Sequence, residues 1–257
     1  MPDLFVTLQE KDDGNEIVVP VRSEEESLAI LKSGDITASK LVPWGSNYTF
    51  AVGIETPDGQ DMLAIYKPRS GESPLYDFPD GTLFKREVAS YLLSKRLGWN
   101  LVPPTVIRSG PHGVGSLQLY IEPEPDGPEL RHFWGQHHPE VERLILFDHI
   151  TNNADRKIGH CLRDAEGKVW GIDHGLTFNH VPKLRTVLWQ LVGEPISPNL
   201  LADLSRVCAE SDVIRGELAR LLSRAEIEAL FARIERFLME RRYPPLNPRR
   251  NIPYGWW

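Results

Sequence analysis

The chain has 257 residues, of which 41% are hydrophobic, so it can bury one large core or the cores of two small lobes. Its formal net charge of -7 argues against a nucleic-acid partner and against an anionic membrane surface, because both are bound through a basic face that neutralises phosphates. We also expect no stable membrane anchor. The two cysteines, Cys161 and Cys208, have no metal-ligand spacing, and the sequence shows neither a signal-peptide pattern nor a membrane span, so we expect a cytoplasmic protein.

The first part of the sequence is predicted to be mainly β-structure. Alternating apolar and polar residues predict a β-hairpin over 3–8 and 16–21. Ser23-Glu-Glu-Glu26 is a capping box that opens a short helix, which is expected to end at Gly34. Periodicity and turn residues then predict two strands, a helix and two further strands over 47–53, 60–67, 82–97, 103–107 and 116–122.

The second part is predicted to be mainly helical and follows a linker over 123–127. The expected helices cover 139–151, 183–192, 198–208, 212–222 and 225–241, the last opened by the capping box Ser223-Arg-Ala-Glu226. A hairpin over 161–163 and 168–172 interrupts them. These patterns predict an α+β fold with a β-rich N-terminal lobe, residues 1–122, and a helical C-terminal lobe, residues 123–257. Small-molecule sites favour clefts between such lobes.

Two aspartates, Asp155 and Asp173, lie eighteen residues apart in polar segments on either side of the predicted hairpin. Phosphoryl transfer needs one carboxylate near the incoming nucleophile and another on the metal that bridges the phosphates of ATP. Because the hairpin folds the chain back, both carboxylates can face one site. The alternative interpretation is that each aspartate only stabilises a turn, as most loop aspartates do.

Lys67 and Glu87 form a second candidate pair. Glu87 lies on the apolar stripe of the helix predicted over 82–97, where a carboxylate is costly unless it is paired. Lys67, at the end of an apolar strand, is a suitable partner, and the pair would aim the ammonium group at the phosphates of ATP. Alternatively, Glu87 extends to the rim of the helix and Lys67 is a solvated strand-end charge.

A third segment, Gly45-Ser-Asn-Tyr48, precedes the strand predicted over 47–53. A small-residue turn of this kind can place backbone N–H groups and the Ser46 hydroxyl over phosphates. A single glycine between two strands is more often only a turn, so this segment is not evidence for nucleotide binding by itself.

In order and type, these motifs resemble the phosphatidylinositol 3- and 4-kinase-like superfamily, and most closely its type II phosphatidylinositol 4-kinases. Gly45 to Tyr48 is similar to the phosphate loop of that family, Tyr66-Lys-Pro68 to its lysine strand, Asp148 to Arg156 to its catalytic helix and loop, and Ile172 to Phe178 to its magnesium-binding segment. The same skeleton is similar to that of the HipA-type kinases, which phosphorylate protein serine. The resemblance covers roughly residues 35–180 and points to a bacterial branch of the superfamily.

The resemblance implies an ATP-dependent kinase with a two-lobed, protein-kinase-like fold and with Mg²⁺ or Mn²⁺ as the metal cofactor. It implies that Asp155 is the catalytic aspartate, that Asp173 chelates the metal, and that Glu87 orients Lys67 toward the α- and β-phosphates. The residues that it implies for nucleotide binding are Gly45, Ser46, Asn47, Lys67, Gln118, Tyr120, Ile121 and Glu122.

The sequence departs from the family at two places. Five residues after the catalytic aspartate, the asparagine that binds a second metal is replaced by His160. Imidazole is a poorer magnesium ligand, so His160 either serves a site that tolerates manganese or is a loop histidine bonded to backbone. The cysteine-rich segment that anchors type II lipid kinases to membranes is absent, which favours a protein or small soluble acceptor over a lipid.

The sequence therefore predicts transfer of the γ-phosphate of ATP to an unidentified hydroxyl group, with Asp155 orienting or deprotonating the acceptor. Two alternatives stay open: an ATP-binding, pseudokinase-like regulator that reports ATP to a protein partner, and a nucleotidyl transferase that uses the same carboxylates. The C-terminal segment from Tyr243 to Trp257 is rich in proline and aromatic residues, and it is predicted to pack along the helical lobe. The alternative for this segment is a docking or autoinhibitory role.

Overall fold

The computed structural model describes residues 22–43 and 47–255. The chain forms two compact units. Of the described residues, those up to Phe84 and Pro104–Tyr120 make the first unit, and Lys85–Pro103 together with those from Ile121 onward make the second. The hairpin predicted over 3–8 and 16–21 lies outside the described residues.

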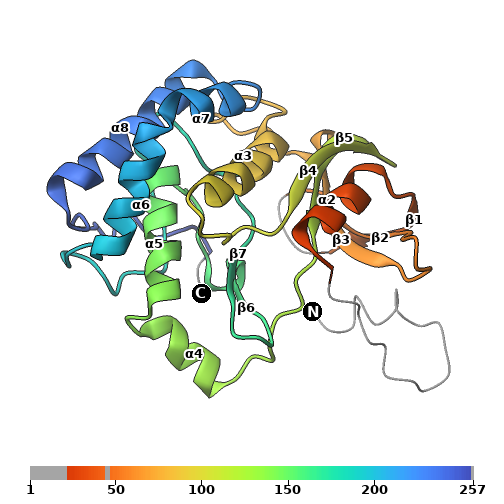
Figure 1. Cartoon of the computed structure of the whole chain (residues 1–257), viewed down its shortest axis with the longest axis horizontal. Coiled ribbons are helices and arrows are strands. Elements are labelled where there is room, and N and C mark those ends of the chain that lie inside the picture. The colour runs from red at the N-terminus through yellow and green to blue at the C-terminus, as the bar shows by residue number, and fades with distance from the viewer. Residues whose placement is uncertain (1–21, 44–46, 256–257) are drawn as a thin grey trace. The chain divides into compact units, whose positions relative to one another are not determined.

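The first unit contains an antiparallel sheet and helix α2 (Figure 1). Its elements in chain order are α2 (Glu24–Ser33), β1 (Ile36–Val42), β2 (Thr49–Ile54), β3 (Met62–Pro68), the 3-10 helix η1 (Arg69–Gly71), β4 (Thr105–Gly110) and β5 (Gly113–Leu119). The strand order is β1-β2-β3-β5-β4, so β5 lies between β3 and β4. The helix and the four strands predicted for this part are confirmed, with shifted ends.

Strand β1 is not predicted from the sequence. Along Ile36–Val42 half-buried and exposed residues alternate, and none is fully buried. The strand lies at one edge of the sheet, where it pairs with β2. Because an edge strand presents little apolar surface to the core, it carries no apolar run that would identify it.

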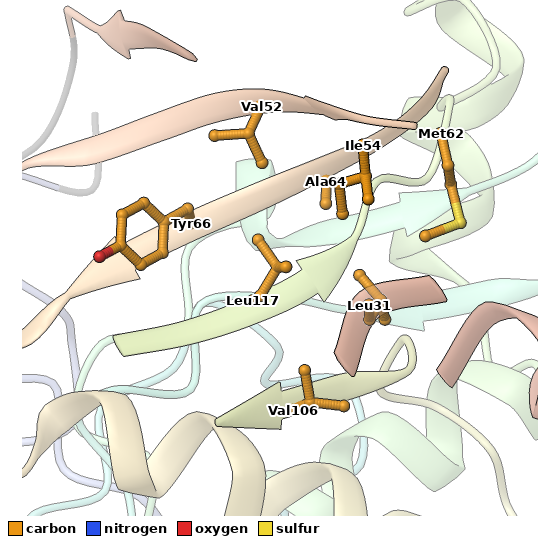
Figure 2. Packing of buried hydrophobic residues seen from close by; sticks show 8 residues of the cluster. All are labelled: Leu31, Val52, Ile54, Met62, Ala64, Tyr66, Val106 and Leu117. Atoms are coloured by element: carbon orange, nitrogen blue, oxygen red, sulfur yellow. The ribbon is translucent and has the colours of Figure 1, made fainter. Parts of the chain in front are cut away.

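The core of the first unit lies on one face of its sheet. Met62, Ala64 and Tyr66 of β3 point to the same face, because side chains alternate along a strand. Figure 2 shows them together with the other members of this core, which are Leu31, Val52, Ile54, Val106 and Leu117. Leu31 belongs to the buried side of α2, which packs against β4 and β5. Helix α2 therefore covers this face of the sheet and completes the core.

Glutamate side chains set the starts of helices α2 and α3. At α2 the predicted capping box is confirmed, since the Ser23 hydroxyl accepts a hydrogen bond from the N–H of Glu26 and the Glu26 carboxylate accepts one from the N–H of Ser23. At helix α3 (Leu83–Arg96) both carboxylate oxygens of Glu72 accept hydrogen bonds, from Leu83 at 3.1 Å and Phe84 at 2.9 Å. Because the first N–H groups of a helix lack partners within it, Glu72 fixes the start of the helix that carries Glu87.

The second unit is mainly helical, as predicted. After α3, which begins in the first unit, its elements are α4 (Pro128–Gly135), α5 (Pro139–Thr151), the 3-10 helix η2 (Ile158–His160), β6 (Cys161–Arg163), β7 (Val169–Gly171), α6 (Pro198–Ala209), α7 (Ser211–Leu218) and α8 (Arg224–Glu240). Helix α5 packs against α8 and β7, and α8 packs against α6 and α7 (Figure 1). The predicted hairpin is confirmed as β6 and β7, and so is the α+β composition of the chain.

The helix predicted over 183–192 is wrong, because the segment is irregular. Its backbone bonds to other segments: the N–H of Arg185 donates to the C=O of Asn153, and the N–H of Thr186 donates to the C=O of Asn251. These long-range bonds use groups that a helix would pair internally. Apolar periodicity alone does not reveal such partners.

The described part of the C-terminal segment, residues 243–255, packs along the second unit, as predicted, and Trp256 and Trp257 lie outside the described residues. Tyr243 is buried, and its N–H donates to the C=O of Glu194. The Asn251 side chain donates to the C=O of Leu184 at 2.6 Å. Among residues 22–43 and 47–255, no helix combines the length and the apolar character needed to cross a membrane.

The observed units differ from the predicted division at residue 122 in one element. Helix α3 and the residues up to Pro103 group with the second unit. Arg86 of α3 explains this grouping, because its buried guanidinium donates to the C=O of Thr177 at 2.7 Å and to the carboxylate of Glu226 at 2.5 Å. Glu226 also closes the capping box of α8, so one carboxylate joins two helices.

Replacing Glu226 by alanine is expected to lower the free energy of unfolding by about 3–5 kcal/mol, because the buried Arg86 guanidinium would lose the carboxylate with which it pairs. Urea unfolding measures the loss. The matched control is Glu228→Ala, which removes the exposed Glu228 from its pair with Arg215 and is expected to cost less than about 1 kcal/mol. An equal effect of the two substitutions would contradict this account of α3.

Candidate active site

The loop that carries Asp155 begins where helix α5 ends. Asn152 adopts a left-handed backbone conformation, with φ of 56°, and its side chain donates to the C=O of Asn179 at 2.8 Å. The Asn153 side chain donates to Asp148 Oδ1 at 2.9 Å, and its oxygen accepts the N–H of Asp155 at 3.0 Å. Two consecutive asparagine side chains thus set the path of the loop toward Asp155.

A buried ion pair anchors this loop to helix α5. The side chains of Asp148 and Arg156 are both 0% exposed, and Arg156 Nε lies 2.8 Å from Asp148 Oδ2. Burial alone would lower the pKa of Arg156, but the adjacent Asp148 carboxylate more than offsets this effect, so the pKa is raised. Arg156 therefore stays charged inside the second unit.

Arg156 also holds the segment around Asp173. Its Nη1 donates to the C=O of His160 and to the C=O of Ile172, each at 2.9 Å, and its Nη2 lies 2.8 Å from Nε2 of His174. Together with Asp148, these groups give an acceptor to each of the five guanidinium N–H groups. Because arginine can only donate, His174 Nε2 is the acceptor and the neutral ring carries its proton on Nδ1.

Asp155 has the surroundings of a general base. Its carboxylate is 24% exposed, and Oδ2 lies 3.0 Å from Lys157 Nζ. Burial raises the pKa of Asp155, and the hydrogen bond and positive charge of Lys157 offset only part of this effect. A partly accessible carboxylate with a raised pKa is suited to proton transfer.

Asp173 has an uncommon backbone conformation, with φ of 58°. Aspartate tolerates this left-handed region better than most residues, but such outliers cluster at functional sites. Its carboxylate is 49% exposed, and Oδ2 lies 3.3 Å from Nε2 of His160. The alternative in which Asp173 only stabilises a turn does not account for the imidazole of His160 opposite its carboxylate.

His160 contacts both a backbone C=O and the carboxylate of Asp173, so it fits both interpretations given from the sequence, the backbone-bonded histidine and the metal ligand. Its Nδ1 lies 3.1 Å from the backbone C=O of Asp155, which places a proton on Nδ1. In a neutral ring the lone pair of Nε2 would then face the carboxylate of Asp173. The lone pair of Nε2 and the Asp173 carboxylate oxygen, 3.3 Å apart, repel each other unless a positive charge lies between them. That charge is either a proton on the imidazole or a metal ion.

Asp173 and His160 fit a divalent cation that takes its remaining ligands from a nucleotide. Within the described residues, no group of three or more His, Cys, Asp and Glu side chains could hold a metal ion. Magnesium is usually bound through one or two carboxylates together with substrate phosphates and water, and manganese accepts imidazole more readily. One carboxylate beside one imidazole matches a site that completes its coordination with phosphates and water and that accepts manganese as well as magnesium.

Glu87 contacts the same segment from helix α3. It is 2% exposed, and its Oε2 accepts a hydrogen bond from the N–H of His174 at 2.9 Å. The predicted burial of Glu87 is confirmed, and the alternative in which it extends to the rim of the helix is wrong. Lys67 is half-buried on β3 opposite Ser116, and its pairing with Glu87 stays a prediction.

The residues predicted to bind adenine lie at and after the end of β5. Gln118 is buried, and its amide donates to the Thr105 hydroxyl across the sheet at 2.9 Å. The N–H of Tyr120 donates to a backbone C=O of β3 at 3.1 Å. Ile121 and Glu122 belong to the second unit. A nucleotide contact by any of these four residues stays a prediction.

Of the predicted phosphate loop, Asn47 is described, whereas Gly45 and Ser46 lie outside the described residues. The Asn47 side chain accepts a hydrogen bond from the N–H of Ser73 at 2.7 Å. This bond ties the end of the loop to the polar turn that follows β3. A phosphate-binding role for the loop stays a prediction.

The Asp148–Arg156 pair is the part of the site that the sequence analysis above does not identify. Helix α5 is buried over most of its length, so a carboxylate within it needs a partner. The same argument that selects Glu87 would have selected Asp148. The identity of its partner depends on the path of the loop, which has no local sequence signal.

The fold of the chain is similar to that of solved kinase structures. A structure of hydra Fam20 with sugar has a TM-score of 0.54 and 14% identity, over 84% of this chain and 88% of that chain. The Golgi casein kinase with Mn/ADP bound has a TM-score of 0.53 and 12% identity, over 85% and 75%. The Helicobacter pylori proinflammatory kinase CtkA has a TM-score of 0.51 and 12% identity, over 82% and 94%. Such identities show the fold alone, and the kinase-like fold predicted from the sequence is confirmed.

No family model matches the sequence. Protein Rv2133c of Mycobacterium tuberculosis is 37% identical over 277 residues, which cover 93% of this chain and 97% of that protein. An identity of this size over nearly the whole of both chains shows common descent. The chain therefore belongs to the same family as Protein Rv2133c of Mycobacterium tuberculosis.

Proposed function

We propose that the chain is an ATP-dependent kinase that transfers the γ-phosphate to a hydroxyl acceptor. The observation that carries the proposal is the grouping of Asp155, Asp173 and His160 around the buried Arg156. The two carboxylates have different surroundings, as phosphoryl transfer requires: one has a raised pKa, and the other faces an imidazole. The kinase-like fold supports the same function.

In the proposed reaction Asp155 orients the acceptor hydroxyl and takes its proton. The hydroxyl oxygen forms a bond to the γ-phosphorus while the bond from that phosphorus to the bridging oxygen breaks, which releases ADP. Lys157 holds the Asp155 carboxylate in place and favours its charged form, because its ammonium lies 3.0 Å away. The proton on His160 Nδ1 ties the imidazole to the backbone of Asp155.

Asp173 and His160 would hold Mg²⁺ or Mn²⁺, which supplies positive charge against the phosphates of the nucleotide. The Golgi casein kinase, which has a similar fold, is described with Mn/ADP, and this supports the inclusion of manganese. Arg156 and Glu87 hold the backbone on both sides of Asp173. They thereby keep the carboxylate directed toward His160.

The nucleotide contacts outside this loop are proposed from the resemblance to the phosphatidylinositol 3- and 4-kinase-like superfamily. Lys67 would bind the α- and β-phosphates, and Glu87 would orient its ammonium. The further nucleotide contacts that we propose are Gly45, Ser46, Asn47, Gln118, Tyr120, Ile121 and Glu122. Membership of that superfamily is itself part of the proposal, and the order of the four motifs along the chain supports it.

We propose a protein or small-molecule hydroxyl, rather than a lipid, as the acceptor. The chain lacks the cysteine-rich anchor segment of type II lipid kinases. A similar fold occurs in a kinase named for casein, which is a protein. Both observations favour an acceptor that is not embedded in a membrane.

Asp173→Asn is expected to abolish metal-dependent stabilisation by ATP. Wild type should gain about 2.7 kcal/mol when the nucleotide is at about 100 times its Kd. Asparagine tolerates the left-handed backbone, so the variant should fold, but it supplies no negative charge to the metal. Thermal-shift titration with ATP and either Mg²⁺ or Mn²⁺ measures the effect. Asp212→Asn, at an exposed position of α7, is the control and should keep the full shift. Equal shifts in both variants would contradict the assigned metal site.

Asp155→Asn is expected to keep nucleotide-dependent stabilisation but to lower phosphate transfer by about 10²–10⁴-fold. Intact mass after incubation with ATP and metal measures transfer to the protein itself or to an added acceptor. A phosphate-sized gain supports the kinase, whereas a nucleotide-sized gain would establish nucleotidyl transfer. Stabilisation without any gain in wild type would favour the regulatory alternative.

The raised pKa of Asp155 predicts a pH dependence. Activity should fall as the pH drops through this raised pKa, because the protonated carboxyl cannot accept a proton. Lys157→Met removes a group that lowers the pKa of Asp155, so the acid limb should move to higher pH, while Lys157→Arg should leave it nearly unchanged. Carboxyl NMR titration, assigned with Asp155→Asn, measures the pKa directly.

The same pKa shift gives the sign of a stability effect. Because the pKa of Asp155 is higher in the folded than in the unfolded chain, its stabilising contribution is present below the unfolded pKa and is lost as the pH rises through the folded pKa. Asp155→Asn stays neutral and should therefore be at least as stable as wild type at neutral pH. A large loss of stability would contradict the assignment of Asp155 as a group kept for function.

A further inference from the structure

A cavity of about 1000 Å³ lies within the second unit, and Asp155, Asp173 and His160 are not among its lining residues. Its walls come from the end of α5, from residues 180–185, from α8 and from the C-terminal segment after Tyr243. The volume is at the upper end of those that hold small molecules. The packed C-terminal segment thus forms one side of a space that the proposed kinase site does not use.

The lining of this cavity is strongly basic, although the chain has a net charge of -7. Among the described lining residues none is acidic. The cationic ones are Lys183, Arg185, Arg233, Arg236, Arg249 and Arg250. Like charges gathered in a concave surface focus a positive potential that attracts anions. Burial, with a further effect of Arg236, lowers the pKa of the lining residue His149 to about 3, so this imidazole adds no charge at neutral pH.

Arg233 shows that the positive charge is incompletely compensated. Its Nε donates to the C=O of Ile150 at 2.7 Å and its Nη1 to the C=O of Asn179 at 3.3 Å, but Nη2 is buried with no hydrogen-bond partner in the described chain. Burial and the neighbouring Arg236 lower the pKa of Arg233 to about 10. Arg236 has a carboxylate, that of Glu240, at 4.0 Å. Buried charges are normally paired, and an anionic ligand would supply the missing charge.

One wall of the cavity suits an organic group. The guanidinium of Arg185 lies over the ring of Tyr254, 4.8 Å from its centroid. Leu246, Ile252 and Pro245 also line the cavity. Apolar and aromatic surface beside clustered cations matches a ligand with an organic body and charged substituents.

We propose that this cavity binds a small soluble molecule that carries two or more phosphate groups. The cations come from three separate segments, residues 183–185, helix α8 and residues 249–250, so a single phosphate would not match them all. Arginine is the residue best suited to phosphate recognition, because its planar fork donates two parallel hydrogen bonds. The concave lining favours a small molecule over a membrane or a nucleic acid, each of which needs an extended basic face.

The cavity shares a wall with the loop that carries Asp155. The N–H of Arg185 donates to the C=O of Asn153 at 2.8 Å, and its C=O accepts the N–H of Arg156 at 3.0 Å. Asn152 lines the cavity and accepts the N–H of Lys183 at 2.8 Å. A ligand bound to Lys183 and Arg185 would therefore stabilise the backbone on both sides of Asp155.

Isothermal titration of the full chain with inorganic tripolyphosphate tests the proposal, with no divalent metal and at about 150 mM salt to screen non-specific attraction. The test variant is R249Q/R250Q, because both side chains are exposed and neither forms a hydrogen bond with the described residues. It should weaken binding by about tenfold or more, since two charged donors are lost. The matched control R220Q/R224Q removes two exposed arginines outside the cavity and should change affinity by less than about twofold.

Two further comparisons make the test specific. Lys67→Gln, which removes the proposed phosphate contact of the nucleotide site, should bind tripolyphosphate as wild type does, and inorganic phosphate should bind at least about tenfold more weakly than tripolyphosphate. The proposal is overturned if wild type shows no binding at millimolar tripolyphosphate, or if the control double variant weakens binding as much as R249Q/R250Q. Loss of binding in Lys67→Gln would instead place the anion in the proposed nucleotide site and would equally overturn it.

Discussion

The arrangement of the candidate site depends on the buried ion pair between Arg156 and Asp148. Both side chains are fully buried, where an uncompensated charge is strongly destabilising, and the pair is tolerated because every guanidinium N–H has an acceptor. The acceptors come from helix α5, from the backbone at His160 and from the segment on both sides of Asp173. One side chain that takes no part in the proposed chemistry therefore brings together three segments that are separate in the sequence.

This network explains how Asp173 keeps an unfavourable backbone conformation. A left-handed residue other than glycine persists only when its surroundings over-determine it. Ile172 is held by Arg156 through its C=O, and His174 is held twice, by Arg156 at its ring and by Glu87 at its N–H. Buried polar groups on both sides of Asp173 thus fix the backbone, while its own carboxylate stays half-exposed and available to a ligand.

Features with local signals could be predicted from the sequence, and features that depend on distant partners could not. Helices α2 and α8 carry capping boxes, and both are where the sequence places them. Strand β1 is defined by its neighbour in the sheet, and residues 183–192 are irregular because their backbone bonds elsewhere. In the candidate site, residue type and order select Asp155 and Asp173 from the sequence, and their roles stay predictions. The role of Arg156 is not, because two of its acceptors are backbone carbonyl groups that any residue supplies.

Residues 183–192, whose irregular structure the sequence does not predict, connect the loop of Asp155 to the basic cavity of the second unit. Arg185 bonds to Asn153 and to Arg156 through its backbone, while its side chain lies over Tyr254 in the basic cavity. If residues 183–192 formed a helix, their backbone groups would pair within that helix. Asn153 and Arg156 would then lose the backbone hydrogen bonds that they make with Arg185. The segment is irregular because its hydrogen bonds are used to position the loop of Asp155, and for the same reason it cannot move within the cavity wall without disturbing that loop.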